Sequence, residues 1–475
     1  MKPHVVIVGT GLGGCYLAAG LVEYFDVTMV ELTGEQPLLR DRLTDLANPA
    51  VTYPTIESGF GGSTKVWHNA LMEIEASIFE KRWPFPKDAL EPFYVQAFQA
   101  LSGTTRGEIN KSADELRNKF EKMGFSRSLL SQAMFIPKVR VNAWETLGLK
   151  DKVKSVEGEV SELVQDDTGR IIKIKLRKSG GVCEFVYADY FVLAAGGLGS
   201  PLLLQKLATV ANLLGLRHAG LHYEDHPVAF VGEVELDKPL YKLWDFPVRT
   251  KAGNANIRIP LSFTHKNLNV SFQLRPAHHL RLSKPREKII SVINDLRNFP
   301  YNPKNYWRLL TQMDDLVDIL SFKFGLRIPT KNYSILMISE QPPSPHCAVW
   351  KFDESTTIYR RWEIDALFID DLKETIKELL RVIEPLTKKV TVFERWPEAI
   401  YSSSHHSGTA RLSNSHDDGV CDINGRVHGV SNLFVCDGSL IPASGFVNTG
   451  LTIVALAMRM ADYFSRFKTI NRDAQ

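Results

Sequence analysis

The first thirty residues alternate between short apolar runs and glycine-rich turns. Residues 5–8 are a continuous run of Val and Ile, which is typical of a strand buried on both faces of a parallel sheet. Residues 15–24 are small and apolar enough for a helix that packs closely on a sheet, and residues 27–30 are the next apolar run. This order predicts a strand, a helix and a second strand, which together form a βαβ unit.

The remaining pattern changes character twice along the chain. Residues 76–139 predict helices, with a proline-marked break at residues 83–86. Short apolar runs then predict strands at residues 155–164, 171–176 and 191–195. Longer amphipathic strands with a helical insert are predicted for residues 227–397, and a strand at 433–436 followed by a helix at 451–464 is predicted near the C-terminus.

Length and composition indicate a globular protein with two domains. The chain has 475 residues, with 57 basic and 54 acidic side chains, and a net charge of +3 is too small to favour a nucleic-acid partner. Five cysteines without a CxxC pair fit reduced thiols, so we expect a cytoplasmic protein with no disulfide framework and no metal site. No signal segment and no membrane span are expected either.

The turn after the first predicted strand carries the pattern Gly9-x-Gly11-x-x-Gly14, and Glu31 follows the second strand. Gly9 permits the tight turn, Gly11 lets the backbone approach a pyrophosphate, and Gly14 lets the helix pack on the sheet. The N-terminus of a helix favours phosphate, and the Glu31 carboxylate can accept hydrogen bonds from a ribose diol. The spacing therefore predicts a dinucleotide site, without distinguishing FAD from NAD.

Two further glycine-rich loops and a C-terminal block carry the other candidate residues. The loops are residues 57–64 and residues 193–201. The block contains His405-His406-Ser-Gly-Thr409, a strand that ends at Asp437-Gly438, and Asn448-x-x-x-Thr452. Two such turns can bring an imidazole and an amide to one point, although Asn448 also fits a cap of the last helix.

These motifs resemble the glucose–methanol–choline (GMC) oxidoreductase family over most of the chain, and the segment at residues 83–94 is similar to its smaller bacterial sugar-oxidising members. The resemblance implies one bound FAD. It also implies that His405, the histidine of H-x-x-G-T, is the catalytic base and that Asn448 is its partner. His406 does not fit the motif spacing, and Asp225-His226-Pro227, similar to another family element, is interpreted as structural.

An alcohol loses hydride easily only when its oxygen gives up or shares its proton. A histidine that is neutral near pH 7 can take this proton, and an amide can donate a hydrogen bond to the developing alkoxide. The hydride itself goes to the flavin. The resemblance thus implies oxidation of an alcohol to a carbonyl by His405 and Asn448.

The resemblance also implies which residues bind the FAD, and most of them lie in the three glycine-rich loops and the C-terminal block. They are Gly9, Gly11, Leu12, Gly14, Glu31, Gly61, Gly62, Ser63, Val66, Asn69, Val160, Ala195, Gly196, Asp437, Gly438, Asn448 and Thr449. Several family members link the flavin covalently through a histidine, but Val66 occupies that position here. We therefore expect FAD to be held non-covalently.

The expected fold class is α/β, with a Rossmann-type FAD-binding domain and a substrate domain that has a mostly antiparallel sheet and a helical cap. The FAD-binding domain is expected to be discontinuous, at residues 1–75, 140–226 and 398–475. Residues 76–139 are expected to be a helical segment at the boundary, and residues 227–397 to be the substrate-binding domain.

Residues 277–331 form a basic, aromatic segment with ten Lys or Arg and five Asp or Glu. This composition is typical either of a solvated cap or of a docking surface for a membrane, a protein or an amphiphilic substrate.

The substrate and the electron acceptor stay open. The resemblance favours a small-molecule alcohol, a sugar or polyol, with oxygen, a quinone or a protein as the electron acceptor. A hydrophobic alcohol such as a sterol, a flavin-binding protein without turnover, and a nicotinamide-dependent reductase are the alternatives.

Overall fold

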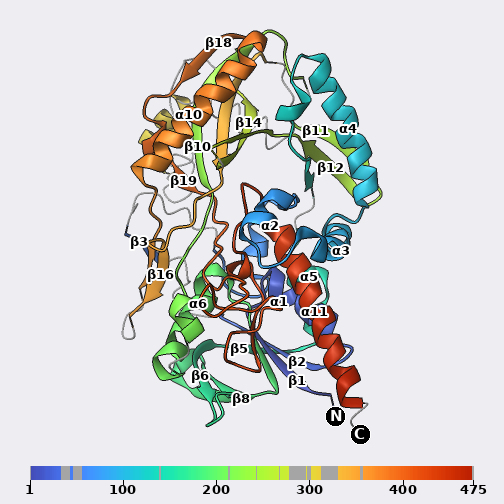
Figure 1. Ribbon diagram of the computed structural model, residues 1–475, viewed down its shortest axis with the longest axis vertical. Coiled ribbons are helices and arrows are strands. Elements are labelled where there is room, and N and C mark those ends of the chain that lie inside the picture. The colour runs from blue at the N-terminus through green and yellow to red at the C-terminus, as the bar shows by residue number, and fades with distance from the viewer. Residues whose placement is uncertain are drawn as a thin grey trace.

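The computed structural model describes residues 2–33, 43–46, 56–138, 141–211, 214–241, 243–266, 268–277, 296, 301–311, 330–352 and 357–472. The chain forms two lobes, which are seen one above the other in Figure 1. The lower lobe contains the parallel sheet and both ends of the described chain. The upper lobe contains a large antiparallel sheet with a helix across it.

The lower lobe begins with the predicted βαβ unit. Strand β1 (His4–Val8) pairs in parallel with β2 (Asp26–Glu31), and α1 (Leu12–Leu21) connects them. The full parallel sheet has the order β20-β9-β1-β2-β5, with β20 at Leu433–Val435, β9 at Tyr190–Leu193 and β5 at Lys154–Glu157. Residues 5–8 are buried throughout, as their unbroken apolar pattern predicts.

The predicted single strand at residues 155–164 is wrong, because Gly158 interrupts it. Gly158 has a φ of 157° and its N–H donates to the carbonyl oxygen of Glu31. The chain therefore leaves the parallel sheet at β5 and enters a separate antiparallel sheet. That sheet comprises β6 (Glu159–Gln165), β7 (Ile171–Arg177) and β8 (Cys183–Tyr187), of which the apolar pattern did not predict β8.

The helical prediction for residues 76–139 is confirmed for most of its length, including the break at the prolines. The helices are α2 (Ala76–Arg82), α3 (Glu91–Ser102) and α4 (Arg106–Lys122). The end of the prediction is wrong, because residues 134–137 form strand β4 (Met134–Pro137). β4 pairs with β12 (Gly253–Arg258), which in turn pairs with β11 (Phe246–Thr250).

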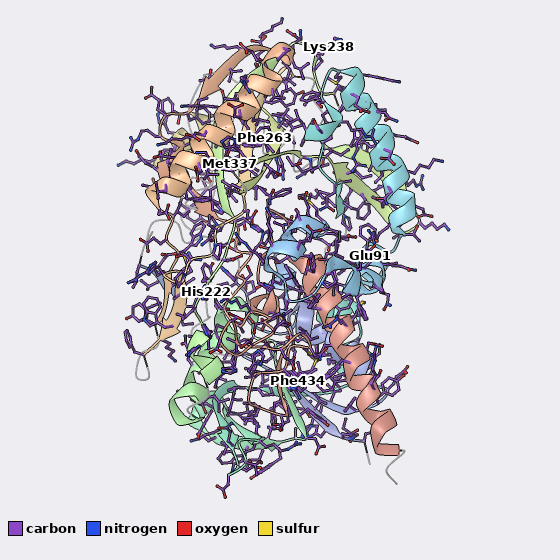
Figure 2. All side chains as sticks on the ribbon, in the orientation of Figure 1. Glu91, His222, Lys238, Phe263, Met337 and Phe434 are labelled. Atoms are coloured by element: carbon purple, nitrogen blue, oxygen red, sulfur yellow. The ribbon has the colours of Figure 1, made fainter. Side chains whose placement is uncertain are left out.

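The upper lobe is built on the sheet β13-β14-β15-β10-β18, with the short strand β19 beside β10. These strands are β10 (Pro227–Leu236), β13 (Leu261–His265), β14 (Leu268–Pro276), β15 (Asn332–Ser339), β18 (Thr387–Val392) and β19 (Tyr401–Ser402). Helix α10 (Ala366–Ile383) crosses this lobe in Figure 1. Figure 2 places Met337 inside this lobe and Phe434 inside the lower one, and both are fully buried.

Two contacts join segments of the two lobes, and the predicted domain boundaries stay a prediction. Strands β16 (Ala348–Lys351) and β17 (Ile358–Arg361) come from the region expected to be the substrate domain. They form a small sheet with β3 (Leu43–Asp45), near α6 (Gly196–Ala211) of the lower lobe. The backbone of Leu71 likewise bridges to Phe135.

The last helix, α11 (Gly450–Arg472), lies against α1 and α3, and its long ribbon runs down the lower lobe in Figure 1. None of the described helices is long and apolar enough to span a membrane. Most of the basic segment 277–331 lies outside the described residues. Its described part includes helix α8 (Pro303–Leu310), on which Trp307 and Leu310 are exposed.

Candidate functional site

The turn between β1 and α1 depends on glycine because other backbone atoms approach it closely. Gly9 has a φ of 108°, and a Cβ there would overlap the carbonyl oxygen of Ala194 on the neighbouring chain segment. A Cβ on Gly14 would overlap the carbonyl oxygen of Gly9. Gly9 thus permits the turn and Gly14 the close packing of helix on sheet, as the spacing predicts.

Gly13, which the motif spacing does not single out, is equally constrained. A Cβ at this position would overlap the carbonyl oxygen of Cys436, at the end of β20. This contact joins α1 to a strand more than 400 residues away in sequence. Only the three-dimensional structure shows the requirement.

Gly11 is different, because a Cβ built there meets no atom within 4 Å. It stands at the N-cap of α1, where the first N–H groups of the helix have no partner inside the helix. The open space beside Gly11 belongs to a large cavity. Packing within the protein therefore does not require glycine at this position, and its role toward a bound group stays a prediction.

Glu31 lies at the end of β2 on the wall of the same cavity, and protein donors surround its carboxylate. Oε2 accepts hydrogen bonds from the backbone N–H of Thr10, at 2.8 Å, and from its hydroxyl, at 2.5 Å. Oε1 accepts from the N–H groups of Leu32, at 3.0 Å, and Gly59, at 3.2 Å. Glu31 thus ties the first glycine turn to the second loop, and its contact with a ribose stays a prediction.

The second loop forms a short 3₁₀ turn at Gly62–Lys65, preceded by Gly61 in the left-handed region with a φ of 91°. The N–H of Gly61 donates to the Thr10 hydroxyl at 3.0 Å, which fixes the two glycine turns to each other. Val66 follows the turn, and its aliphatic side chain lines the cavity.

The third loop and the C-terminal block meet at Asp437. Its Oδ2 accepts hydrogen bonds from the N–H of Gly196, at 2.9 Å, and the hydroxyl of Ser200, at 2.5 Å. Its Oδ1 accepts from the N–H and hydroxyl of Ser439. The carboxylate thus links the N-terminal end of α6 to the turn after β20.

These loops and strand ends enclose one cavity of about 430 Å³, a volume in the range of ligand sites. Of the predicted site residues, Gly14 and Gly61 do not line it. The others do, and they are Gly9, Gly11, Leu12, Glu31, Gly62, Ser63, Val66, Asn69, Val160, Ala195, Gly196, His405, Asp437, Gly438, Asn448 and Thr449. The cavity therefore extends from the carboxylate of Glu31 to the imidazole of His405.

His405 and Asn448 meet directly on this wall, although 43 positions separate them. Nδ2 of Asn448 lies 3.0 Å from Nε2 of His405. Because the amide nitrogen carries only donor hydrogens, Nε2 accepts in this contact and carries no proton. Asn448 stands just before α11, whose N-terminal residue, Gly450, also lines the cavity.

The environment of His405 keeps its ring uncharged. Burial, together with the neighbouring His226, lowers the pKa of His405 to about 3, although the Asp225 carboxylate acts in the opposite direction. The ring is therefore neutral at pH 7, with a bare nitrogen able to accept a proton. Nδ1 lies 3.0 Å from the hydroxyl oxygen of Ser403.

His406 also lines the cavity but has different partners. Its Nδ1 lies 2.7 Å from the hydroxyl of Tyr223, a buried side chain that also contacts Arg360. Its Nε2 has no hydrogen-bond partner among the described residues, and burial lowers its pKa to about 4. His406 is thus connected to Asp225 through the Tyr223 hydroxyl, whereas the ring of His405 pairs with Asn448.

Asp225 also belongs to this site, although its sequence motif did not indicate this. It is 1% exposed, and it accepts hydrogen bonds from the backbone N–H of His405 and from the hydroxyl of Ser403. Burial alone would raise the pKa of Asp225, but nearby histidines and the hydrogen bond from Ser402 hold it well below the usual value. Its position 180 residues before His405 gives no sign of this contact in the sequence.

The donors and the free space of the cavity fit a dinucleotide. The open space at Gly11 adjoins the start of α1, and an anion at that position is favoured by the helix N-terminus. Within the described residues no cluster of His, Cys, Asp or Glu has the arrangement of a metal site, and all five cysteines are free. At the end of the cavity away from Glu31 lie an imidazole and an amide, those of His405 and Asn448.

Parts of this chain are similar in sequence to known proteins. Residues 363–457 match the family model described as GMC oxidoreductase. A long-chain-alcohol oxidase from Arabidopsis thaliana is 31% identical over 85 residues, or 18% of this chain. A 2-methyl-1,2-propanediol dehydrogenase from Mycolicibacterium austroafricanum is 45% identical over 62 residues, or 13% of this chain. The matched segments span 11% of the length of each relative.

A solved structure extends the likeness to the whole chain. Pyridoxine 4-oxidase from Mesorbium loti has a TM-score of 0.59 with 16% sequence identity, over 98% of this chain and 99% of the other. At that identity the match shows the fold. It confirms the expected α/β architecture, with a parallel sheet in one lobe and an antiparallel substrate sheet in the other.

Proposed function

Since the chain belongs to the GMC oxidoreductase family, we propose that it binds FAD and oxidises an alcohol to a carbonyl compound. One observation carries this proposal: the His405–Asn448 pair lies on the wall of the same cavity as the glycine turn at Gly11 and the carboxylate of Glu31. A proton acceptor and a dinucleotide cradle thus share one enclosed space.

The residues that would hold FAD surround this space. The N-terminus of α1 and Gly11 would face the pyrophosphate, and Glu31 would face the adenosine ribose. When bound, FAD supplies the acceptor for the hydride that leaves the alcohol carbon. The start of α11 beside Asn448 brings a partial positive charge to the opposite end of the cavity.

His405 would take the proton of the alcohol. Nε2 is bare and faces the amide of Asn448, so an alcohol oxygen that replaces this direct 3.0 Å contact would find one acceptor and one donor. Because the pKa of His405 is about 3, proton transfer to it is favourable only when the new positive charge is compensated. The buried Asp225 carboxylate, which supports the turn that carries His405, already favours the charged ring, but burial and the neighbouring His226 outweigh it.

The substrate we favour is a sugar or polyol hydroxyl, with a hydrophobic alcohol as the alternative. Among the relatives, one is a diol dehydrogenase by name and another a long-chain-alcohol oxidase, so both classes occur. The cytoplasmic location proposed from the reduced cysteines and the docking role proposed for residues 277–331 stay predictions.

The test of the proposal is anaerobic bleaching of the bound flavin. We expect that one class in a panel of sugars, polyols, sterols and long-chain alcohols removes the absorbance of the oxidised flavin under nitrogen. Admission of oxygen then separates an oxidase, which regains its colour quickly, from a dehydrogenase that needs a quinone or protein acceptor. A flavin that no alcohol bleaches would indicate a flavin-binding protein without turnover.

We also predict that the FAD is released when the protein unfolds. Val66, at the position where family members carry a linking histidine, has an aliphatic side chain that cannot bond to the flavin. Acid precipitation of the purified protein should leave the yellow chromophore in the supernatant. Colour retained by the washed precipitate would show a covalent link, and peptide mapping should then test His68, which also lines the cavity.

A further inference from the structure

The turn that carries His405 is fastened to one buried carboxylate. Residues 402–405 wrap around Asp225, and Ser404 within this turn has a φ of 61°, in the left-handed region. The groups that donate hydrogen bonds to the carboxylate are the hydroxyls of Tyr223, Ser402 and Ser403 and the backbone N–H groups of His226, Ser404 and His405. Six donors to one carboxylate exceed what the folding of a short turn requires.

The Ser403 hydroxyl also lies within hydrogen-bonding distance of the imidazole. Its oxygen lies 2.7 Å from Oδ1 of Asp225 and 3.0 Å from Nδ1 of His405. A hydroxyl has a single proton, and a carboxylate can only accept, so the Ser403 proton points at Asp225. The lone pairs of the hydroxyl oxygen are then left to accept, and Nδ1 of His405 must carry the proton that it donates to Ser403.

The other side of the ring leads to the same assignment. Nδ2 of Asn448 faces Nε2 at 3.0 Å and can only donate to it. The two contacts together select one tautomer, with the proton on Nδ1 and the lone pair on Nε2. An unconstrained neutral imidazole prefers its proton on Nε2, so this tautomer has to be imposed by the protein.

We propose that Asp225 and Ser403 are positioning residues that hold the proton of His405 on Nδ1 and so reserve Nε2 as the proton acceptor. The inference rests on the proposed function for its purpose, since a bare Nε2 on the cavity wall is what an alcohol proton needs. When Nε2 gains that proton, the chain from Nδ1 through the Ser403 hydroxyl to the Asp225 anion lies on the opposite side of the new cation. This Ser403–Asp225 relay would thus fix the tautomer before the proton transfer and stabilise the imidazolium after it.

The tautomer can be measured in the FAD-loaded protein without any alcohol, from the nitrogen NMR spectrum of ¹⁵N-histidine-labelled enzyme. A bare ring nitrogen resonates far downfield of a protonated one, and the His405→Gln variant identifies the signals of His405. We expect a bare Nε2 in the native protein. In the Ser403→Ala variant we expect a bare Nδ1, with the Asn448 amide turned so that its oxygen accepts from the protonated Nε2. Ser403→Thr, which keeps the hydroxyl, should restore the native spectrum.

Ser402 provides the matched control. Its hydroxyl also donates to Asp225 but does not contact His405, so Ser402→Ala should keep the native tautomer at a similar cost in melting temperature. In stopped-flow reduction, Ser403→Ala should be slower than Ser402→Ala by about 10-fold or more, toward the ~10⁴-fold loss that a wrong histidine tautomer causes elsewhere.

Two results would overturn the inference: a native His405 protonated on Nε2, or a tautomer that Ser403→Ala leaves unchanged. These are distinct from failure of the proposed function. If no alcohol reduces the flavin while the tautomer responds to Ser403→Ala, the positioning stands and alcohol oxidation is refuted. If alcohols do reduce the flavin but His405 is protonated on Nε2, the function stands and the relay is refuted.

Discussion

Replacement of His405 by alanine is expected to slow reduction of the flavin by an alcohol by about 10²–10⁴, the usual loss for a positioned acid–base group, while FAD stays bound. The ring lies 3.0 Å from the Asn448 amide on the cavity wall, and burial keeps it neutral at pH 7. Stopped-flow spectroscopy under nitrogen, with the alcohol that bleaches best, measures this step directly.

His406→Ala is the matched control for this experiment. The side chain lies next to His405 on the same wall, but its hydrogen bond goes to Tyr223. We expect a lower melting temperature for this variant, because a buried polar contact is lost, with little change in the rate of flavin reduction. Normal reduction by His405→Ala together with an inactive His406→Ala would show that the base is His406 and that the interpretation of the motif is displaced by one residue.

Asn448→Ala belongs in the same series. It removes one hydrogen-bond donor and leaves the proton acceptor in place, so a smaller loss of about 10–10³ is expected. An equal loss in the two variants would indicate that Asn448 mainly holds His405 in place, and the tautomer measurement would then separate the two roles.

The sequence predicts those parts of the site whose signals are local. Gly9 and Gly11 lie within three residues of each other on a turn between an apolar run and a helix, and Gly9, with a φ of 108°, has a conformation that favours glycine. His405 and Asn448 are found by the spacing of short motifs, and the fold brings them within 3.0 Å. The β1–α1–β2 unit is predicted by two short apolar runs for the strands and by the small, apolar residues between them for the helix.

The parts that the sequence does not predict depend on contacts between distant segments. Asp225 was interpreted as structural from its place in the Asp225-His226-Pro227 element, yet its carboxylate accepts a hydrogen bond from the backbone N–H of His405. Gly13 has no place in the motif, but Cys436 leaves no room for a side chain there. The break at Gly158 is a change of sheet, which an uninterrupted β-rich pattern does not reveal.

Gly11 and Gly13 offer a second large effect, which separates cofactor binding from packing within one turn. Alanine at Gly13 would place Cβ on the carbonyl oxygen of Cys436, so α1 must move away from β20. Overpacking of this kind costs about 1–3 kcal/mol of folding free energy, and more where backbone has to shift. We therefore expect a clearly lower denaturant midpoint for the Gly13→Ala apoprotein.

Alanine at Gly11 should instead leave the stability of the apoprotein nearly unchanged and weaken the binding of FAD. Its Cβ meets no protein atom within 4 Å, and Gly11, with a φ of −71° and a ψ of −169°, has a backbone conformation open to any residue. The apoprotein should therefore unfold within about 0.5 kcal/mol of the native chain. FAD affinity should fall by about 10- to 150-fold, equivalent to about 1.5–3 kcal/mol, the scale of a lost hydrogen bond to a charged group.

Titration of each apoprotein with FAD, followed by denaturant unfolding with and without the cofactor, measures both quantities. The decisive comparison is within the pair, because the same methyl group is added two residues apart. If Gly11→Ala binds FAD as tightly as the native chain, the pyrophosphate does not approach the start of α1, and the cavity holds its ligand in another way. If Gly11→Ala instead unfolds like Gly13→Ala, the glycine is there for packing, and the open space beside it is not the reason for its presence.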